Sequence, residues 1–314
     1  MYRGKFLLFL RTLTPTHVGL GRGYAGYVDQ PIQRDEFGFP TIWSSSLKGA
    51  IKANITGEVR RCLGPDPDEL EPASMKQSRV TFTDAKLLLI PVRVISGVYA
   101  YATSLHLLER FSKYVEALQS GEEAKGKKKD RKSFLEEMFE SIDKNLLDEL
   151  RNGKVEAITS SKNLVRGNYL IANETPLNAQ VVEKLGDPLV NLMPDELRSK
   201  IKDKLVVVTD ANNVSLNLVN KSIIVQHRVR LRRDTKTVEH GPWSEEYLPS
   251  ETILVSLVLC RESPQAQQQE QGSPRCDANT VKTALENIGV LFVGGMETIG
   301  RGLLKVYVVE GLKA

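Results

Sequence analysis

Two periods in the pattern of apolar and polar side chains predict the elements of this chain. Short apolar runs bounded by polar residues or proline are typical of buried strands, and apolar positions three and four residues apart are typical of helices. In the first part of the chain the pattern predicts a strand at residues 5–14, a helix at 47–62, two strand segments around Pro91 within 80–94, and a helix at 104–118. In the last part it predicts strands at 204–209, 222–233, 252–260, 290–293 and 303–309 and a helix at 279–288.

The longest alternation lies at residues 222–233 and predicts an antiparallel strand that is buried on one face. One face holds Ile223, Val225, His227, Val229 and Leu231, and the other holds Ile224, Gln226, Arg228, Arg230 and Arg232. The loop at residues 234–243 would turn the chain into the strand at 252–260, so we expect these two strands to form a hairpin.

The two ends of the chain have a similar order of elements. The first part reads strand, loop, helix, strand, and the last part reads strand, helix, strand, loop, strand, which predicts an α+β fold of the ferredoxin-like type. Residues 120–200 are polar, with a helical run at 133–150, and are expected to be a helical insertion. The basic run KGKKKDRK at residues 125–132 and the Gln-rich stretch at 265–276 are expected to be solvated loops.

The composition places the chain among ordinary globular proteins. Its 314 residues suffice for a large core, and its hydrophobic fraction of 41% excludes a wholly disordered or fibrous chain. The longest nearly apolar stretch, residues 253–260, is far shorter than the roughly 20 residues of a membrane-spanning helix. The apolar run at residues 6–10 lacks a small-residue cleavage site, so no signal peptide is expected. We therefore expect a soluble protein that is not secreted.

Charge and cysteine content narrow the function classes further. The 43 Lys and Arg against 39 Asp and Glu give a net charge of +4, so a basic binding site would have to come from local clustering. Cys62, Cys260 and Cys276 are odd in number, widely spaced and not in a CxxC pair. We therefore expect reduced thiols, and neither a disulfide framework nor a structural zinc site. The four histidines are also too scattered to predict a metal cluster.

The glycine-rich segment at residues 14–43 is too long to be a simple connection within a compact domain, which favours a functional role. His17 and Asp29 lie on this segment. If they converge, they form a plausible acid–base or metal-holding pair, and the alternative is that each is an ordinary turn residue.

A second glycine-rich segment, residues 294–302, resembles a nucleotide-binding P-loop only superficially. Arg301 and Gly302 stand where that motif needs Lys and Ser or Thr, and a strand follows in place of a helix, which excludes ATP binding through this loop. Its glycines permit close approach to a sugar-phosphate backbone, and a tight connection between strands is the alternative. The arginines of residues 228–233 are similarly either phosphate contacts or an exposed strand face.

Several of these segments carry a family resemblance. The segments are TPTHVG (14–19), GYVDQPIQR (26–34), FPTIWSSSLKGA (39–50), GPWSEEYLPS (241–250) and GGMETIGRGLLKV (294–306). In this order they resemble the signature segments of the RAMP superfamily of CRISPR proteins. The resemblance is closest to the repeating backbone subunit of the type III-B (Cmr) effector complex.

The resemblance implies a ferredoxin-like (RRM-like) palm with a helical insertion and a β-hairpin thumb. The palm would comprise residues 1–119 and 204–314, the insertion residues 120–203, the thumb about residues 234–250, and the glycine-rich loop residues 294–302. Several copies would stack along a CRISPR guide RNA in the cytoplasm with other Cmr subunits and without a membrane. The complex would cleave the paired target RNA at regular intervals.

The resemblance also implies roles for individual residues. The slicing aspartate falls on Asp29, which would hold a divalent cation, Mg²⁺ or Mn²⁺, and His17, Glu245 and Tyr247 would assist. RNA would be bound by Ser45, Ser46, Lys48, Arg34, Arg228, Arg230, Gly294, Gly295, Met296 and Arg301. Backbone contacts of this kind suit RNA binding without sequence preference.

Two other functions stay open from the sequence alone. A guide-binding RAMP subunit that does not cut RNA would have no need for a carboxylate at Asp29. A RAMP endonuclease that processes precursor guide RNA is less supported, because the spacing shows neither a pair of histidines nor a His/Tyr/Lys site.

Overall fold

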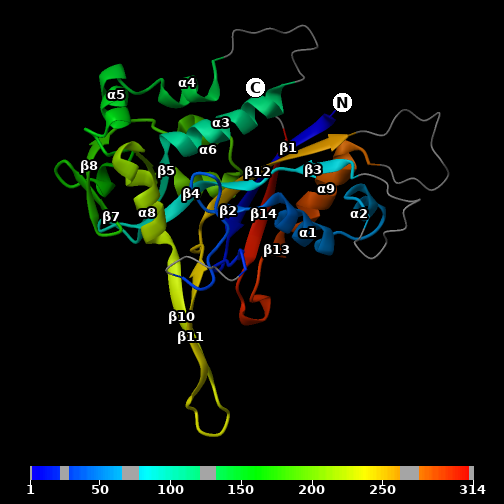
Figure 1. Ribbon diagram of the computed structural model, residues 1–314. Helices are drawn as coiled ribbons and strands as arrows, with labels where there is room; N and C mark the ends of the chain where they lie inside the picture. The colour runs from blue at the N-terminus through cyan, green and yellow to red at the C-terminus, as the bar shows by residue number, and fades with distance from the viewer. Residues whose placement is uncertain (1, 22–27, 66–77, 121–131, 262–275, 311–314) are drawn as a thin grey trace.

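The computed structural model of the chain (Figure 1) describes residues 2–21, 28–65, 78–120, 132–261 and 276–310. Its strands are β1 (Tyr2–Thr12), β2 (Thr41–Ile42), β3 (Val80–Phe82), β4 (Ala85–Arg93), β5 (Tyr99–Ser104), β6 (Ala157–Thr159), β7 (Tyr169–Ala172), β8 (Thr175–Val181), β9 (Leu205–Val208), β10 (Ile224–Leu231), β11 (Val238–Tyr247), β12 (Ile253–Arg261), β13 (Val290–Phe292) and β14 (Leu303–Glu310). Most of these described strands form one mixed sheet in the order β13-β14-β1-β12-β4-β5-β9-β6-β8-β7, with β2 beside β4 and β3 beside β12. Neighbours are antiparallel except for the pairs β5–β9 and β6–β8.

Strand β1 lies inside this sheet between β12 and β14 and is apolar on both faces. Phe6, Leu8 and Leu10 belong to the core on one side of the sheet, and Leu7 and Phe9 belong to the core on the other side. All five side chains are fully buried. Because both faces are covered, the strand reads as a continuous apolar run and not as an alternation.

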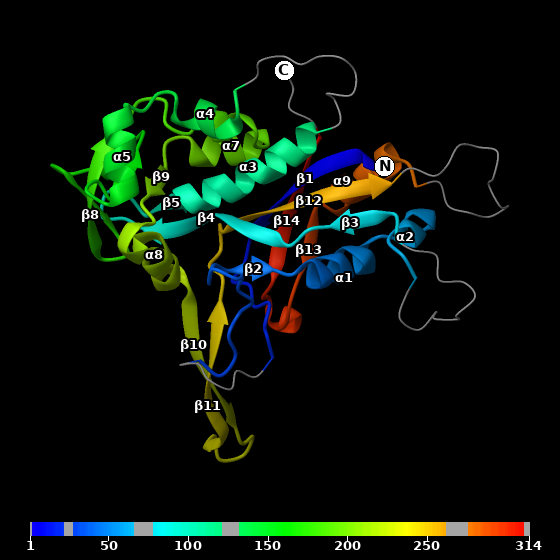
Figure 2. The same ribbon diagram turned by 45° about the horizontal axis from the view of Figure 1, so that its top comes forward.

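Helices cover both faces of the sheet, as Figure 2 shows. They are α1 (Ser44–Asn54), α2 (Glu58–Cys62), α3 (Leu105–Gln119), α4 (Phe134–Phe139), α5 (Lys144–Asn152), α6 (Asp187–Asn191), α7 (Asp195–Ile201), α8 (Val214–Ser222) and α9 (Ala278–Ile288). Helices α1, α8 and α9 contribute Leu47, Leu218 and Leu285 to the core that contains Phe6. Helices α3 to α7 pack in the opposite core, with Phe111 of α3 against Phe9 of β1. The molecule is therefore a three-layered mixed α and β structure.

Several predicted elements of the two ends are confirmed. Strand β1 begins and ends within three residues of its predicted bounds, and α3 begins after Ser104, whose side chain accepts the Leu107 amide. Helix α9, capped by Asp277, and the strands β13 and β14 also lie where the pattern predicts them.

Two predicted boundaries are wrong. The single helix at 47–62 is two helices, because Gly57 adopts a positive φ of 73° between α1 and α2. Pro91 does not separate two strands but lies inside β4, opposite Tyr101 of β5. In the described residues β12 pairs with β4 only up to Leu89, so the missing N–H of Pro91 leaves no ladder bond unmade.

Residues 120–203 do not form a purely helical insertion. Three short strands, β6, β7 and β8, lie in this region and extend the main sheet beyond β9. The predicted helical run at 133–150 is also split, because Ser133 caps α4 and Asp143 caps α5. Strands β6 and β7 have only three and four residues, which is too short to show a period in the sequence. Most of the basic run at 125–132 and of the stretch at 265–276 lies outside the described residues.

The strand at 222–233 is confirmed as β10, but both its predicted partner and its predicted burial are wrong. Strand β10 pairs with β11 and forms a separate two-stranded hairpin that projects away from the main sheet (Figures 1 and 2). The strand at 253–261, β12, pairs with β1 instead. Val225, Val229 and Leu231 are 45–48% exposed, so the alternation does not mark a face buried within the chain.

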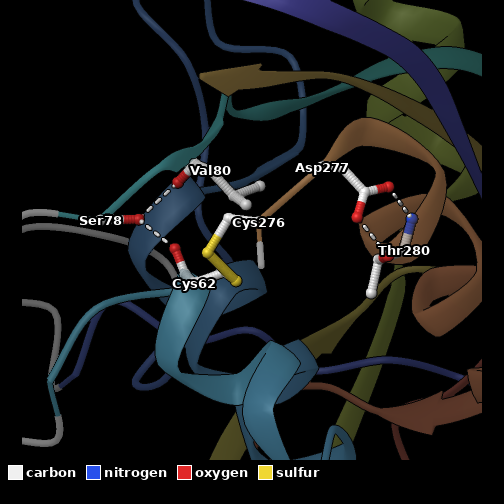
Figure 3. The surroundings of a disulfide bond; sticks show 6 residues. All are labelled: Cys62, Ser78, Val80, Cys276, Asp277 and Thr280. Carbon is white, nitrogen blue, oxygen red and sulfur yellow. Dashed lines mark hydrogen bonds between the residues drawn. A yellow bond between two sulfur atoms is a disulfide. The ribbon is translucent and has the colours of Figure 1, made fainter. Parts of the chain in front are cut away.

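The expectation of reduced thiols is also wrong for two of the three cysteines. Cys62 at the end of α2 and Cys276 before α9 form a disulfide, with their Cα atoms 5.6 Å apart (Figure 3). Both side chains are buried, and Cys260 is a buried free thiol. The fold brings together two cysteines that are 214 positions apart, and this proximity leaves no trace in their spacing.

No helix in the described part of the chain is both long enough and apolar enough to span a membrane.

Candidate functional site

The first glycine-rich segment is attached to the base of the β10–β11 hairpin. Thr16 and Leu248 exchange two backbone hydrogen bonds of 2.9 Å. Further along, the Gln30 amide donates to the Ser244 carbonyl at 3.0 Å, and the Glu246 amide donates to the Gln30 carbonyl at 3.0 Å. This isolated parallel bridge holds the residues around Gln30 alongside β11. Asp29 is thereby held at the base of the hairpin.

Alternation along β11 divides the side chains at this base between two faces. Glu245 and Tyr247 point to one face, where they meet the loop at 294–302, and we call it the glycine-loop face. Ser244 and Glu246 point to the other, which we call the Asp29 face. Two separate clusters of polar groups therefore lie back to back across one strand.

On the Asp29 face, the carboxylate of Asp29 is fixed by Ser244. Its Oδ2 atom accepts hydrogen bonds of 2.8 Å from both the amide and the hydroxyl of Ser244, and its own amide donates to the Ser244 hydroxyl at 3.0 Å. Asp29 is exposed. The hydrogen bonds from Ser244 lower the pKa of the Asp29 carboxyl, and the charge of His227 lowers it further. Asp29 is therefore an ionised and accessible group in a defined orientation.

Glu246 orders the rest of the first segment from the same face. Its carboxylate accepts the Ile32 amide at 3.1 Å and forms an ion pair of 3.1 Å with Arg34. Arg34 also donates to the Gly38 carbonyl and to the Asn220 side chain. The predicted RNA-binding guanidinium of Arg34 is thus already surrounded by partners within the chain.

The glycine-loop face holds a buried hydrogen-bonded cluster around Glu245. Its carboxylate accepts from the Trp243 indole at 2.6 Å, from the Tyr247 hydroxyl, and from Arg228 at 3.3 Å. Burial opposes the charge of Glu245, but these hydrogen bonds and the positive charge of Arg228 outweigh it and lower the pKa. Burial, followed by the hydrogen bond to Glu245, raises the pKa of Tyr247 to about 12. The pair is a charged carboxylate held by a neutral phenol.

His17 packs on the same side and is buried. Its Nδ1 atom lies 2.7 Å from the Glu246 carbonyl, and its ring lies 5.6 Å from the ring of Tyr247. Its own carbonyl accepts the Gly295 amide at 2.9 Å. His17 therefore joins the first segment to the hairpin and to the glycine-rich loop.

The four residues predicted to be catalytic do not form one cluster in this structure. Asp29 is exposed on one face of β11, whereas Glu245 and Tyr247 are only 1% and 0% exposed on the opposite face. His17 contacts Tyr247 and has no hydrogen bond to Asp29 among the described residues. In this arrangement the three buried residues support the base of the hairpin, and Asp29 alone is accessible.

The glycine-rich loop is closed largely by contacts within the chain. The Gly295 amide is used by His17, and the Met296 sulfur accepts the Tyr247 hydroxyl at 2.8 Å. The Arg301 guanidinium lies over the Tyr247 ring at 5.0 Å and donates to Gln226 at 3.1 Å. Position 294 requires glycine, because a Cβ atom there would overlap the His17 carbonyl. The predicted RNA-binding loop is therefore also a structural clamp on the first segment.

The other predicted RNA-binding residues lie on α1 and on the hairpin. Ser45 is exposed at the N-terminus of α1, near Ser46, where helix amides lack partners within the helix. Lys48 follows and is half-buried, and burial together with the charge of Lys52 lowers its pKa. On the hairpin, Arg228 pairs with Glu245 and Arg230 pairs with Glu239 at 3.1 Å. The predicted RNA-binding residues of this group are therefore divided between helix α1 and the hairpin.

A divalent cation at the base of the hairpin would be held by one exposed carboxylate, that of Asp29. No group of three or more potential metal-ligating His, Cys, Asp or Glu side chains occurs in the residues that the structure describes. Asp29 fits a hydrated Mg²⁺ or Mn²⁺, because Mg²⁺ is commonly held by one or two carboxylates while water and phosphate oxygens complete its shell. The Oδ1 atom of Asp29 has no hydrogen bond to the described part of the chain and is the oxygen that would face such an ion.

The sequence did not identify Ser244 and Glu246 as site residues. Both are ordinary polar residues of a strand, and only the pairing of Gln30 with β11 places them beside Asp29. Their spacing of two in the sequence was the available signal, since it puts them on one face of a strand.

Comparisons with known proteins extend over almost the whole chain. A relative from Pyrococcus furiosus, "CRISPR system Cmr endoribonuclease Cmr4", is 32% identical over 319 residues, which cover 97% of this chain and 96% of the relative. The "CRISPR system CMR subunit Cmr4" of Saccharolobus solfataricus is 28% identical and covers 95% of this chain and 94% of its own length.

Solved structures give the same result. A chain of type III-B Cmr-beta bound to cognate target RNA matches with a TM-score of 0.72 at 28% identity over 98% of both chains. Oligomeric Cmr4 from Pyrococcus furiosus matches with a TM-score of 0.64 at 28% identity over 99% of both chains. The sequence model of the RAMP superfamily matches residues 9–305, and the chain therefore belongs to the RAMP superfamily.

Proposed function

We propose that this protein is the repeating, guide-binding backbone subunit of a type III-B CRISPR effector complex and that it cleaves the paired target RNA at regular intervals. The observation that carries the cleavage is Asp29, an exposed, oriented and ionised carboxylate at the base of an exposed hairpin. The relatives are in accord, since one is named an endoribonuclease and a similar structure is bound to target RNA. Its partners are guide RNA, target RNA, further copies of itself and other Cmr subunits, and its compartment is the cytoplasm.

The arrangement of elements supports a ferredoxin-like palm and a thumb. The antiparallel order β14-β1-β12-β4, with α1 and α9 in the core on one face, is the order that a β-α-β-β-α-β unit gives. The β10–β11 hairpin is the thumb, and it extends over residues 224–247 instead of about 234–250. Asp29 lies at the base of the thumb, beside the bridge that joins Gln30 to β11.

The chemistry of the cut follows from what the described residues offer. An RNA strand can cleave itself when its 2′ hydroxyl is placed in line with the neighbouring phosphate, so positioning supplies much of the rate. Ser244 holds Asp29 in one orientation through Oδ2, which leaves Oδ1 without a hydrogen bond to the described part of the chain. A divalent ion bound by Asp29 would supply positive charge to the phosphate oxygens.

The test compares the wild type and Asp29→Asn in a complex reconstituted with guide RNA and end-labelled target RNA. We expect Asn to fill the same space and to leave assembly and target binding unchanged, whereas cleavage falls by ~10²-fold or more. EDTA should abolish wild-type cleavage, and the 5′ products should end in 2′,3′-cyclic phosphate because the nucleophile is the RNA's own hydroxyl.

Wild-type cleavage by Asp29→Asn at the regular positions would contradict the catalytic role. The protein would then be a guide-binding structural subunit, and the cut would belong to another component. Cleavage that persists in EDTA would remove the metal from the proposal and leave Asp29 as the reacting group.

A further inference from the structure

A second group with useful chemistry lies on the Asp29 face, on the other strand of the hairpin. His227 of β10 is paired directly with Ser244 of β11. Residues paired across an antiparallel ladder project to the same face. Ser244 projects toward Asp29, as its hydrogen bonds show, so His227 shares that face. His227, Ser244 and Asp29 form a row across the two strands of the hairpin and the segment that is bridged to β11.

His227 is the accessible group at one end of this row. The residue is exposed, and in the described part of the chain its ring has neither a hydrogen bond nor an ion pair. Its charge nevertheless reaches Asp29, because it contributes to the lowered pKa of that carboxyl. Ser244 is small and lies between the two groups, so a phosphodiester placed over Ser244 would have Asp29 on one side and an imidazole on the other.

The other titratable side chains that the structure describes at the hairpin base already have partners within the chain. On the same face, the Glu246 carboxylate is bonded to Arg34 and to the Ile32 amide. On the opposite face, Glu245 and Tyr247 are buried and bonded to each other. His17, the histidine that the sequence favoured, is buried with Nδ1 against the Glu246 carbonyl.

We propose that His227 is a catalytic residue of the cut and donates the proton that the departing 5′ oxygen needs. The inference rests on the proposed function. The 2′ oxygen forms a bond to phosphorus while the bond between phosphorus and O5′ breaks. The imidazolium of His227 gives its N–H proton to O5′, and the 2′ hydroxyl proton passes to water. Histidine is suited to this step because it exchanges protons near neutral pH.

The test uses two target RNAs with the complete reconstituted complex. One has the ordinary phosphodiester at a cut position, and the other has sulfur in place of the bridging O5′ there. A thiolate leaves without being protonated, so the sulfur substrate has no need of a proton donor. His227→Ala should cut the ordinary RNA ~10²-fold or more slowly at saturating target and should cut the sulfur substrate at nearly the wild-type rate.

The chain provides a matched control in His240, which is exposed on β11 further out along the same hairpin. His240→Ala should cut both substrates at the wild-type rate, and Asp29→Asn should be slow on both. Equal losses of His227→Ala on the two substrates, or no loss on either, would overturn the proton-donor role. A wild-type complex that binds both targets and cuts neither would instead overturn the proposed function, and this inference with it.

Discussion

Two glycines in the loop at residues 294–302 share a backbone conformation but differ in their surroundings. Gly294 has φ of 91° and Gly300 has φ of 76°, a region that side chains rarely adopt. A Cβ atom at Gly294 would overlap the His17 carbonyl, whereas at Gly300 no described atom lies within 4 Å. The first glycine is therefore required by the contact with the first segment, and the second only by its turn.

We predict that Gly294→Ala destabilises the protein more than Gly300→Ala does. The positive φ alone accounts for ~1–2 kcal/mol at each position, and overlap with His17 adds to it at Gly294 only. Urea unfolding of the two variants beside the wild type measures the difference. Equal losses would mean that the loop can move away from His17 and that the clamp is not rigid.

At the scale of elements, the sequence predicts an element best where the apolar side chains of that element are buried within the chain. The apolar run of β1 reflects burial on both faces, and the helical spacing of α3 reflects burial on one face. The bounds of β1 were predicted within three residues and those of α3 within one. The β10–β11 hairpin is different. Alternation indicates that the two faces of a strand differ in polarity, but it does not indicate whether another element covers either face. Its partner strand and its exposure are set by the topology, which no local period contains.

The same limit applies to the candidate site. Asp29 stood out as an acidic residue in a long glycine-rich segment, and Glu245 and Tyr247 came from the family resemblance. That these residues lie on opposite faces of β11 follows from the bridge between Gln30 and Glu245, a pairing 215 positions apart in sequence that spacing does not reveal. The roles of Ser244 and His227 depend on that pairing as well.

The buried cluster at the hairpin base predicts a pH-dependent stability. The pKa of Glu245 is lower in the folded chain than in the unfolded one, where it is near 4.3, so its charge stabilises the fold at neutral pH. This contribution is complete above that value and is lost as the pH falls through the lower, folded value. Glu245→Gln should lose ~1–3 kcal/mol at pH 7, because the Arg228 guanidinium and the buried donors around position 245 lose the charged group that they bond.

Unfolding of wild type and Glu245→Gln, followed from pH 7 down to pH 3, measures this effect. We expect the gap between the two proteins to narrow as the pH falls through the lowered pKa of Glu245 and the wild-type carboxyl takes up a proton. A gap that stays constant over this range would show that the amide loses packing or hydrogen bonds and that the charge of Glu245 does not stabilise the hairpin base.

At the scale of the whole molecule, one covalent link spans most of the chain. The disulfide joins the end of α2 to the residue before the cap of α9 (Figure 3). These two helices belong to the same core as Phe6. Around it, the Ser78 hydroxyl donates to the Val80 carbonyl at 2.6 Å, and Asp277 accepts the Thr280 amide at 2.9 Å. The closed loop contains the whole region from β3 to β12, including the hairpin. The link therefore connects the first and last parts of the chain directly.

We predict that the disulfide stabilises the fold by about 2–5 kcal/mol, the upper part of the usual range, because the closed loop is long. Urea unfolding of the oxidised protein and of the protein reduced under denaturing conditions and refolded with reductant measures the loss. A Cys62→Ser/Cys276→Ser double variant should be less stable than the oxidised wild type and insensitive to reductant.

Thiol titration of the oxidised chain in denaturant should find one reactive group, Cys260. In the folded state burial raises the pKa of the Cys260 thiol to about 12, so this thiol should be unreactive there. Three reactive thiols without reductant, together with equal stability of the oxidised and the reduced protein, would contradict the disulfide. The cysteines would then be reduced, as their spacing predicts.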